Sequence, residues 1–162
     1  MSEQSLYDRL IVSTAPAMLV VTANGPEGPA GCLVGFSTQA SIRPERHLVL
    51  LSKQNRTYRV AQDSPVLVVH VLRESDHEVA EHFGGTTGDR ADKFDGIATI
   101  EGPGGAPIIE GLDWFAGRVL QQFDCGDHVA FLLAAHDGSA LRAGEAPLVL
   151  GDAADIEPGH SA

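Results

Sequence analysis

A chain of 162 residues, 43% of them hydrophobic, is long enough for one domain with a hydrophobic core and too short for two ordinary domains. Its 22 acidic residues against 11 Lys and Arg give a formal charge of −11, which repels the phosphate backbone of nucleic acids. We therefore expect a single domain over residues 1–162 that binds no nucleic acid.

The chain is predicted to open with a short helix. Leu6, Leu10 and Ile11 follow helical spacing, and Pro16 ends the pattern soon after Ser13. The first ten residues lack the basic start and apolar run of a secretory signal, and no apolar stretch reaches membrane-spanning length. We expect a cytoplasmic protein without membrane contact, whose two cysteines are reduced thiols.

Strands are predicted next, because the hydrophobic period changes. Residues 18–23 form a β-branched run that Asn24, Gly25 and Pro26 close, and a second run begins near Ala30, which predicts a hairpin. Further strands are expected over residues 47–52, 65–72, 112–123 and 128–136. The last two pair naturally across the turn at residues 125–127.

Two short helices are predicted between the strands, one from Asn55 and one over residues 76–83. Strands outnumber helices and do not alternate strictly with them, which favours a mainly β fold, an antiparallel barrel with peripheral helices. Residues 84–96 show no period and predict a surface loop. The core is expected within residues 14–150, with 151–162 as a flexible tail.

The second helix contains HEVAEH, which is close to the His-Glu-x-x-His motif of zinc peptidases. His77 and His82 are five residues apart instead of four, which separates them by about 140° around a helix. One metal ion could not take both. The pattern instead indicates an amphipathic helix that turns Val79, Ala80 and Phe83 toward a core, and no metal site is predicted.

Neither standard nucleotide-binding fingerprint is present, since no Gly-x-Gly-x-x-Gly and no Gly-x-x-x-x-Gly-Lys-Ser/Thr occurs. Residues 35–39, GFSTQ, lack the second glycine of a nucleophile elbow. A Rossmann crevice and an α/β-hydrolase site are therefore not expected.

Six blocks in chain order resemble the flavin reductase family: AGCLVGFSTQASIRP, LLSKQNRTYRVAQDS, VHVL with a helix ending in HFGG, KFDG, CGDHVAFLL and PLVL. The resemblance runs from about Met18 to Leu150. It implies an FMN-binding split barrel that transfers hydride from NADH or NADPH to FMN or FAD. It also implies a homodimer that can supply reduced flavin to a partner monooxygenase. A flavin brings its own redox chemistry, so no nucleophile is required.

The resemblance assigns the strand and turn from residue 33 to residue 41 to the isoalloxazine ring, through backbone groups and small hydroxyl side chains. An ordinary strand and turn, with serines bonded to their own backbone, is the alternative. A single proline, Pro44, departs from the family pattern and leaves the choice between FMN and FAD open. The candidate residues are Leu33, Val34, Gly35, Phe36, Ser37, Thr38 and Ser41.

The run SKQNRT offers a dense set of donors for a flavin phosphate in an otherwise acidic chain. A capped helix start with solvated Lys and Arg is the alternative interpretation. The resemblance favours phosphate binding, with Ser52, Lys53, Asn55, Arg56 and Thr57 as candidates.

Gly126-Asp127-His128 corresponds to a family motif whose histidine lies near the flavin and the nicotinamide, which makes His128 the candidate catalytic residue. Alone, the triplet is typical of a hairpin connection. Lys93 and Phe94 match a loop block that is expected to cover the nicotinamide, or else Phe94 anchors the loop on the core.

Two other functions stay open. The barrel could hold flavin as a non-enzymatic binding or electron-transfer module, or it could use a deazaflavin or haem. Turnover of NADH or NADPH and the absorption spectrum distinguish these alternatives.

Overall fold

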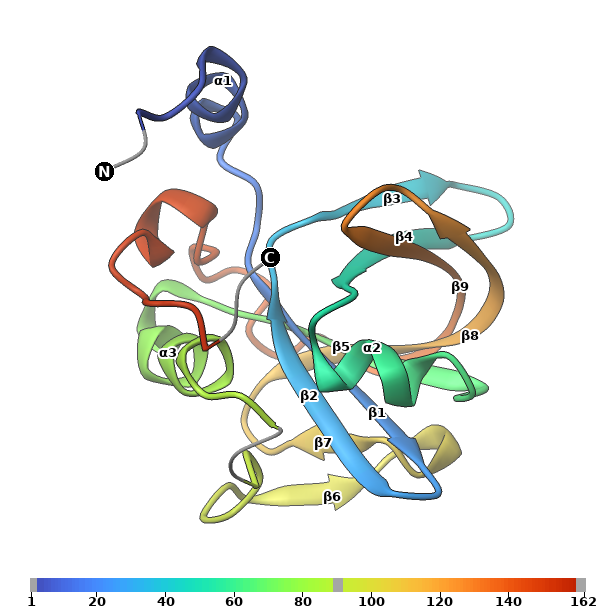
Figure 1. The fold of residues 1–162 in the computed structure, drawn as a ribbon. Coiled ribbons are helices and arrows are strands. Elements are labelled where there is room, and N and C mark those ends of the chain that lie inside the picture. Colours follow the sequence, from blue (N-terminus) through green and yellow to red (C-terminus); the bar gives the residue numbers. More distant parts are fainter. Residues whose placement is uncertain (1–2, 89–91, 160–162) are drawn as a thin grey trace.

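The computed structural model describes residues 3–88 and 92–159, and it is built on one seven-stranded antiparallel sheet with the strand order β2-β1-β5-β8-β9-β4-β3 (Figure 1). The sheet curls into a barrel, so the predicted antiparallel barrel with peripheral helices is confirmed. The strands are β1 (Leu19–Gly25), β2 (Gly28–Val34), β3 (Ser37–Ser41), β4 (Arg46–Ser52), β5 (Val66–Val71), β8 (Asp113–Asp124) and β9 (His128–Ser139).

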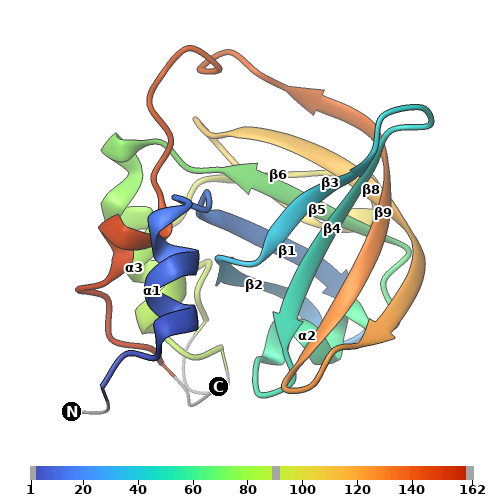
Figure 2. The same cartoon turned by 90° about the horizontal axis from the view of Figure 1, so that it is seen from above.

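The helices and a small second sheet lie around the barrel. Figure 2 shows α1 and α3 gathered on one side of it with the C-terminal segment. The additional elements are α1 (Leu6–Ser13), α2 (Arg56–Ala61), α3 (His77–Gly85), the two-stranded sheet of β6 (Thr99–Glu101) and β7 (Pro107–Ile109), and the 3-10 turns η1 (Glu74–Asp76), η2 (Pro103–Gly105) and η3 (Leu150–Ala153).

The two long strands β8 and β9 bend the sheet. Their pairing shifts register between Ala116 and Gly117 and again between Val119 and Gln121, and such bulges increase twist and curvature. A Cβ atom at Gly117 would lie 2.7 Å from Cβ of Leu133, so only glycine fits at the first shift. The predicted pairing of residues 112–123 with 128–136 and the predicted hairpin of β1 with β2 are both present.

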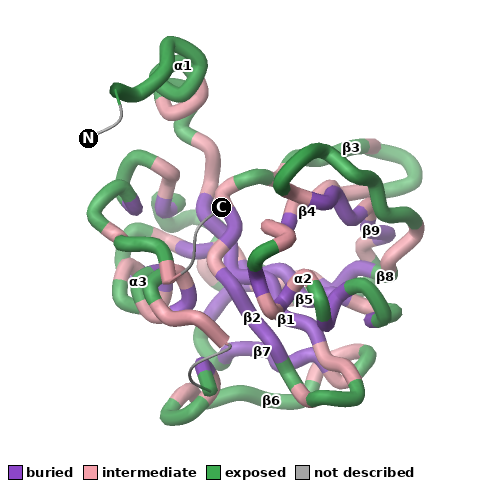
Figure 3. Tube along the Cα trace, in the orientation of Figure 1, coloured by how far each residue is buried: buried purple, intermediate pink, exposed green. Residues whose placement is uncertain are grey.

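The core has two main parts, which lie on opposite faces of β1. Val21 and Leu19 face the barrel interior, where they pack with residues such as Phe131. Val20 belongs to the outer cluster, which includes Ala80 and Phe83 of α3. β1 is therefore buried on both faces, and Figure 3 shows it within the buried centre while α1 is exposed. The predicted core-facing side of α3 is confirmed.

His70 bridges three strands from the centre of β5. The Ile109 N–H donates to its Nε2 at 3.0 Å, so Nδ1 carries the proton and donates to the Val20 carbonyl at 3.0 Å. Burial lowers the pKa of His70 to about 4. The neutral ring is therefore part of the native fold.

The pKa of His70 predicts a loss of stability in mild acid. The unfolded chain binds the proton near pH 6.5 and the folded chain only near pH 4, so stability is present above about pH 6.5 and falls as the pH drops. We expect a loss of about 2 kcal/mol by pH 5 in the free energy of urea unfolding. His70→Gln should remove most of this slope, and His136→Gln, which changes an exposed histidine, should not. An unchanged slope in His70→Gln would contradict the assignment.

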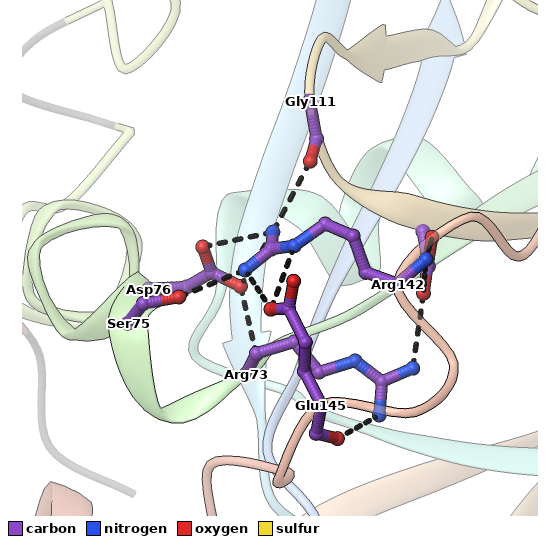
Figure 4. A network of polar contacts seen from close by, with 7 residues as sticks. Arg73, Ser75, Asp76, Gly111, Arg142 and Glu145 are labelled. Carbon is purple, nitrogen blue, oxygen red and sulfur yellow. Dashed lines mark hydrogen bonds and ion pairs between the residues drawn. The ribbon is translucent and has the colours of Figure 1, made fainter.

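The chain that leaves β9 is tied to the rest of the fold by a network of ion pairs (Figure 4). The Arg142 guanidinium donates to both carboxylate oxygens of Asp76 at 3.1 Å, to the Gly111 carbonyl and to Glu145. Asp113 accepts from the backbone N–H of Arg142 and from the Arg73 guanidinium at 3.0 Å. The network holds η1, β8 and residues 142–145 together.

The segment after β9 then runs back beside β1 and α3. The Leu148 carbonyl accepts from the Met18 N–H, and the Leu148 N–H donates to the Leu72 carbonyl. Ala153 in η3 is buried. Residues 151–159, expected as a flexible tail, thus include packed positions. The predicted loop over residues 84–96 contains three residues, 89–91, that lie outside the described residues, and its other part includes the buried Lys93.

No helix in the described part of the chain has the length and apolar character needed to cross a membrane.

Candidate functional site

A cavity of about 280 Å³ opens at the edge of the sheet, where β2 has no strand on its outer side. We call it the apolar cavity, because aliphatic side chains make up most of its lining. It is enclosed by the end of β4, by Asn55, which caps α2, and by the C-terminal segment. Its lining consists of Met18, Cys32, Leu33, Val34, Gly35, Phe36, Leu50, Leu51, Ser52, Asn55, Gly84, His128, Leu150, Ala153, Ile156 and Pro158.

His128, at the start of β9, contributes an imidazole ring to the lining of the apolar cavity. Its Nδ1 lies 2.7 Å from Oδ1 of Asp127, and its ring centroid lies 4.8 Å from that of Phe36. The hydrogen bond with His128 lowers the pKa of Asp127, so this carboxylate is ionised at neutral pH and orients the imidazole. A proton held on Nδ1 leaves Nε2 as the acceptor in the neutral ring and as a second donor in the cation.

A second cavity, of about 260 Å³, adjoins the first along β2 and is lined mainly by polar and charged residues. We call it the polar cavity. The Arg56 guanidinium is held at its wall, since it donates to the carbonyls of Pro29 at 2.8 Å and Glu27 at 3.2 Å. The lining consists of Glu27, Pro29, Ala30, Gly31, Arg56, Thr57, Gly88, Asp92, Lys93 and Phe94.

The two cavities lie next to each other along β2 and the start of α2, and we call them together the groove. Residues 29–31 of β2 line the polar cavity and residues 32–34 line the apolar cavity. Asn55, which caps α2 by accepting from the Thr57 N–H at 3.0 Å, faces the apolar cavity, whereas Thr57 faces the polar one. Each cavity alone is slightly below the roughly 300–1,000 Å³ of ordinary ligand sites.

Lys93 forms part of the floor of the polar cavity and is only 5% exposed. Its ammonium group donates to the carbonyls of Gly31 at 3.0 Å and Phe83 at 2.9 Å, which ties the loop after α3 to β2. Phe94 packs edge-on against Phe83, with centroids 5.6 Å apart, so it anchors the loop on the outer core. The interpretation of Phe94 as a core anchor therefore has direct structural support.

Cys32 lies in the wall of the apolar cavity but is only 2% exposed. Burial raises the pKa of its thiol, so the group is protonated at neutral pH and is no nucleophile. The groove thus offers an apolar slot, polar groups at its rim and one histidine. A lining of this kind can hold a flat aromatic group that carries its own reactivity.

Seven of the residues assigned from the sequence meet at the apolar cavity, namely Leu33, Val34, Gly35, Phe36, Ser52, Asn55 and His128. Arg56, Thr57 and Phe94 line the polar cavity. Four others lie elsewhere. Ser37, Thr38 and Ser41 belong to the edge strand β3, and Lys53 forms an ion pair with Asp124 at 2.8 Å.

The lining also contains residues that the sequence did not single out. Leu50 and Leu150 lie within two of the blocks but were not assigned to the site, and Met18, Ala153, Ile156 and Pro158 close the apolar cavity from outside the blocks. Their only sequence signal is an apolar or small side chain. Gly84 also lines the cavity, and its sequence signal is its place in the block HFGG. Only glycine fits there, because a Cβ atom would lie 2.7 Å from Cδ2 of Leu33.

The two histidines of HEVAEH do not converge. His77 Nε2 lies 3.1 Å from Asp155, whereas His82 Nε2 contacts the Lys93 carbonyl. Among residues 3–88 and 92–159, no cluster of three or more His, Cys, Asp or Glu side chains could hold a metal ion.

The profile of the family described as "Flavin reductase like domain" matches residues 12–154. The chain belongs to the flavin reductase-like family. The match covers the barrel, the groove and the network of Figure 4, and it ends at residue 154, within the C-terminal segment.

Among named relatives of this flavin reductase-like chain, a diflavin flavoprotein A 3 of Synechocystis sp. is 27% identical over 145 residues, which are 88% of this chain and 24% of that protein. The chain thus spans about a quarter of the length of such relatives. The 4-hydroxyphenylacetate 3-monooxygenase reductase component of Pseudomonas aeruginosa is 26% identical, with 88% and 85% of the two chains covered.

The solved structure of the NADH:FAD oxidoreductase SgcE6 of Streptomyces globisporus C-1027 superposes with a TM-score of 0.75. It is 24% identical, and the match covers 85% of this chain and 83% of that one. This likeness establishes that the two chains share the split-barrel fold.

Proposed function

We propose that this protein is an NAD(P)H-dependent flavin reductase, and the observation that carries the proposal is the two-part groove along β2. An apolar slot that continues into a pocket containing Arg56 and Lys93 matches a molecule with a flat ring system at one end and a phosphate at the other. FMN and FAD are such molecules. When bound, the flavin supplies the redox chemistry by accepting hydride from NADH or NADPH.

The residues of the apolar cavity would hold the isoalloxazine ring. Leu33, Val34 and Leu51 provide apolar contact, and the outer edge of β2 presents peptide groups that no neighbouring strand pairs. Ser52 and Asn55 add polar atoms at the rim. Together these groups exclude water from one face of the ring and fix its orientation, which is the main contribution that a protein makes to flavin chemistry.

The residues of the polar cavity would hold the phosphate. Arg56 and Lys93 are both fixed by backbone carbonyls, so their positive charges are positioned before a ligand arrives. Glu27 and Asp92 lie in the same lining and repel a phosphate, so the proposed phosphate contact is the Arg56 guanidinium, with the buried charge of Lys93 behind it. In this arrangement Lys53 contributes less than the sequence indicates, since Asp124 already neutralises it.

His128 is the proposed catalytic residue, because it is the titratable side chain that Asp127 orients at the apolar cavity. Its ring can hydrogen bond to the nicotinamide carboxamide or to the flavin. Oxidation of NADH and NADPH, followed at 340 nm with added FMN or FAD, tests the function. We expect turnover with at least one donor, and His128→Ala should lower kcat/KM about tenfold to a hundredfold.

The assay also separates the alternatives. Flavin binding without oxidation of either donor would overturn the reductase proposal in favour of a flavin-binding or electron-transfer module. A purified protein whose absorption spectrum is that of a deazaflavin or haem would place another cofactor in the groove. Unchanged kinetics in His128→Ala would leave this residue as a turn residue.

We further propose that the protein is a cytoplasmic homodimer that can supply reduced flavin to a partner monooxygenase. The named relative from Pseudomonas aeruginosa, a reductase component, supports the partner. The exposed apolar side chains of Leu6, Tyr7 and Leu10 on α1 support the dimer, since a second copy could cover them, and sedimentation analysis would reveal it.

A further inference from the structure

The last described residues of the chain form a wall of the apolar cavity. After η3 the backbone turns and runs along the C-terminal end of α3 as far as Gly159 (Figure 1). We call residues 155–159 the strap. Ile156 and Pro158 of the strap line the apolar cavity, opposite β2 and His128. The strap begins directly after residue 154, where the family match ends.

Backbone contacts hold the strap against α3. The Gly159 N–H donates to the Gly84 carbonyl at 3.1 Å, and the Ile156 N–H donates to the Ala153 carbonyl at 3.1 Å. His77 adds an exposed contact to Asp155 at 3.1 Å. The strap is therefore attached at both ends and along its side.

The strap packs closely against Gly84 and Gly85, the two glycines that end α3. A Cβ atom at Gly84 would lie 2.7 Å from Cδ2 of Leu33 and 3.3 Å from Cγ2 of Ile156. At Gly85 it would lie 3.5 Å from the Glu157 carbonyl. Ile156 thus packs beside Gly84 in the lining of the cavity, and it joins the outer core cluster.

We propose that the strap is a flavin-retaining wall and that Ile156 is its specificity-determining residue, which covers the apolar ring system in the groove. This inference rests on the proposed function. β2, the end of β4 and the residue that caps α2 line the apolar cavity on the side of the barrel, and Leu150 and the strap contribute the rest of its apolar lining. Removal of the strap exposes apolar surface of the bound ring, so the flavin dissociates faster.

FMN binding to the full chain tests the proposal, with the quenching of flavin fluorescence as the readout for the dissociation constant and stopped-flow for the dissociation rate. We expect Ile156→Ala to raise Kd about tenfold, mostly through faster dissociation. Deletion of residues 155–162 should raise Kd further. Glu157→Ala is the matched control, because this neighbouring side chain is exposed and lies outside the apolar cavity.

The outcomes separate the two proposals. A wild-type chain that binds no flavin contradicts the proposed function itself. Tight binding by the wild type together with an unchanged Kd and dissociation rate in both Ile156→Ala and the deletion variant overturns the strap and leaves the reductase standing. Thermal unfolding of each variant establishes that the barrel is intact, since the strap lies outside the strands.

Discussion

Replacement of Ser52 by Trp is expected to weaken flavin binding by more than about a hundredfold. Ser52 ends β4 and lines the apolar cavity, and its side chain accepts only a 3.3 Å hydrogen bond from the Gln54 N–H. An indole at this position would occupy a large part of a cavity of about 280 Å³. The site is at the rim of the barrel and half-buried, so the barrel itself should fold.

Fluorescence titration with FMN measures this effect, with Gln39→Trp as the control. Gln39 is exposed on β3 and lies outside both cavities, so a tryptophan there changes the same optical and hydrophobic properties without filling the groove. A folded Ser52→Trp protein that binds FMN within a few fold of the wild type would place the flavin elsewhere.

Replacement of Arg142 by Met is expected to cost about 3 kcal/mol of unfolding free energy. The change preserves much of the side-chain volume but removes the guanidinium from Asp76, whose side chain is only 10% exposed. An ionised carboxylate would then be left in a largely buried place with the Arg73 N–H as its remaining donor in the network. The Gly111 carbonyl would lose the same partner.

Urea unfolding at neutral pH gives the size of this loss. Arg9→Met, on the exposed face of α1, is the control and should change the unfolding free energy by less than about 0.5 kcal/mol. Asp76→Asn in the Arg142→Met background should recover part of the loss, because it removes the uncompensated charge. A loss below 1 kcal/mol in Arg142→Met would show that the network of Figure 4 is solvated in solution.

The elements that the sequence predicts well are those whose pattern is local. The hairpin of β1 and β2 has two β-branched or small apolar runs around a Pro and Gly turn, and Asn55 signals the start of α2 through its capping side chain. The edge strand β3 was not predicted, because STQAS has no apolar alternation and is fixed by pairing with β4. β6 and β7 are only three residues each, and they depend on pairing with each other and on the packing of β7 against β1 and β5.

The candidate site likewise contains residues that the sequence predicts and residues that it does not. Leu33 to Phe36, Ser52 and His128 could be grouped because their blocks resemble a family in which they lie together, and the structure brings them to one cavity. Ile156 and Pro158 could not be grouped, because nothing local in an acidic, small-residue segment indicates a return to β2. Lys93 is similar. A lysine in a long loop is usually solvated, and its burial depends on the distant carbonyls of Gly31 and Phe83.

The central claim is that a flavin occupies the groove along β2, and equilibrium titration of the purified chain with FMN and with FAD tests it most directly. The account predicts saturable quenching of flavin fluorescence at micromolar concentrations or below, with one flavin bound per chain and a rise in the unfolding temperature. Unquenched fluorescence and an unchanged unfolding temperature with both flavins at about 100 μM would contradict it.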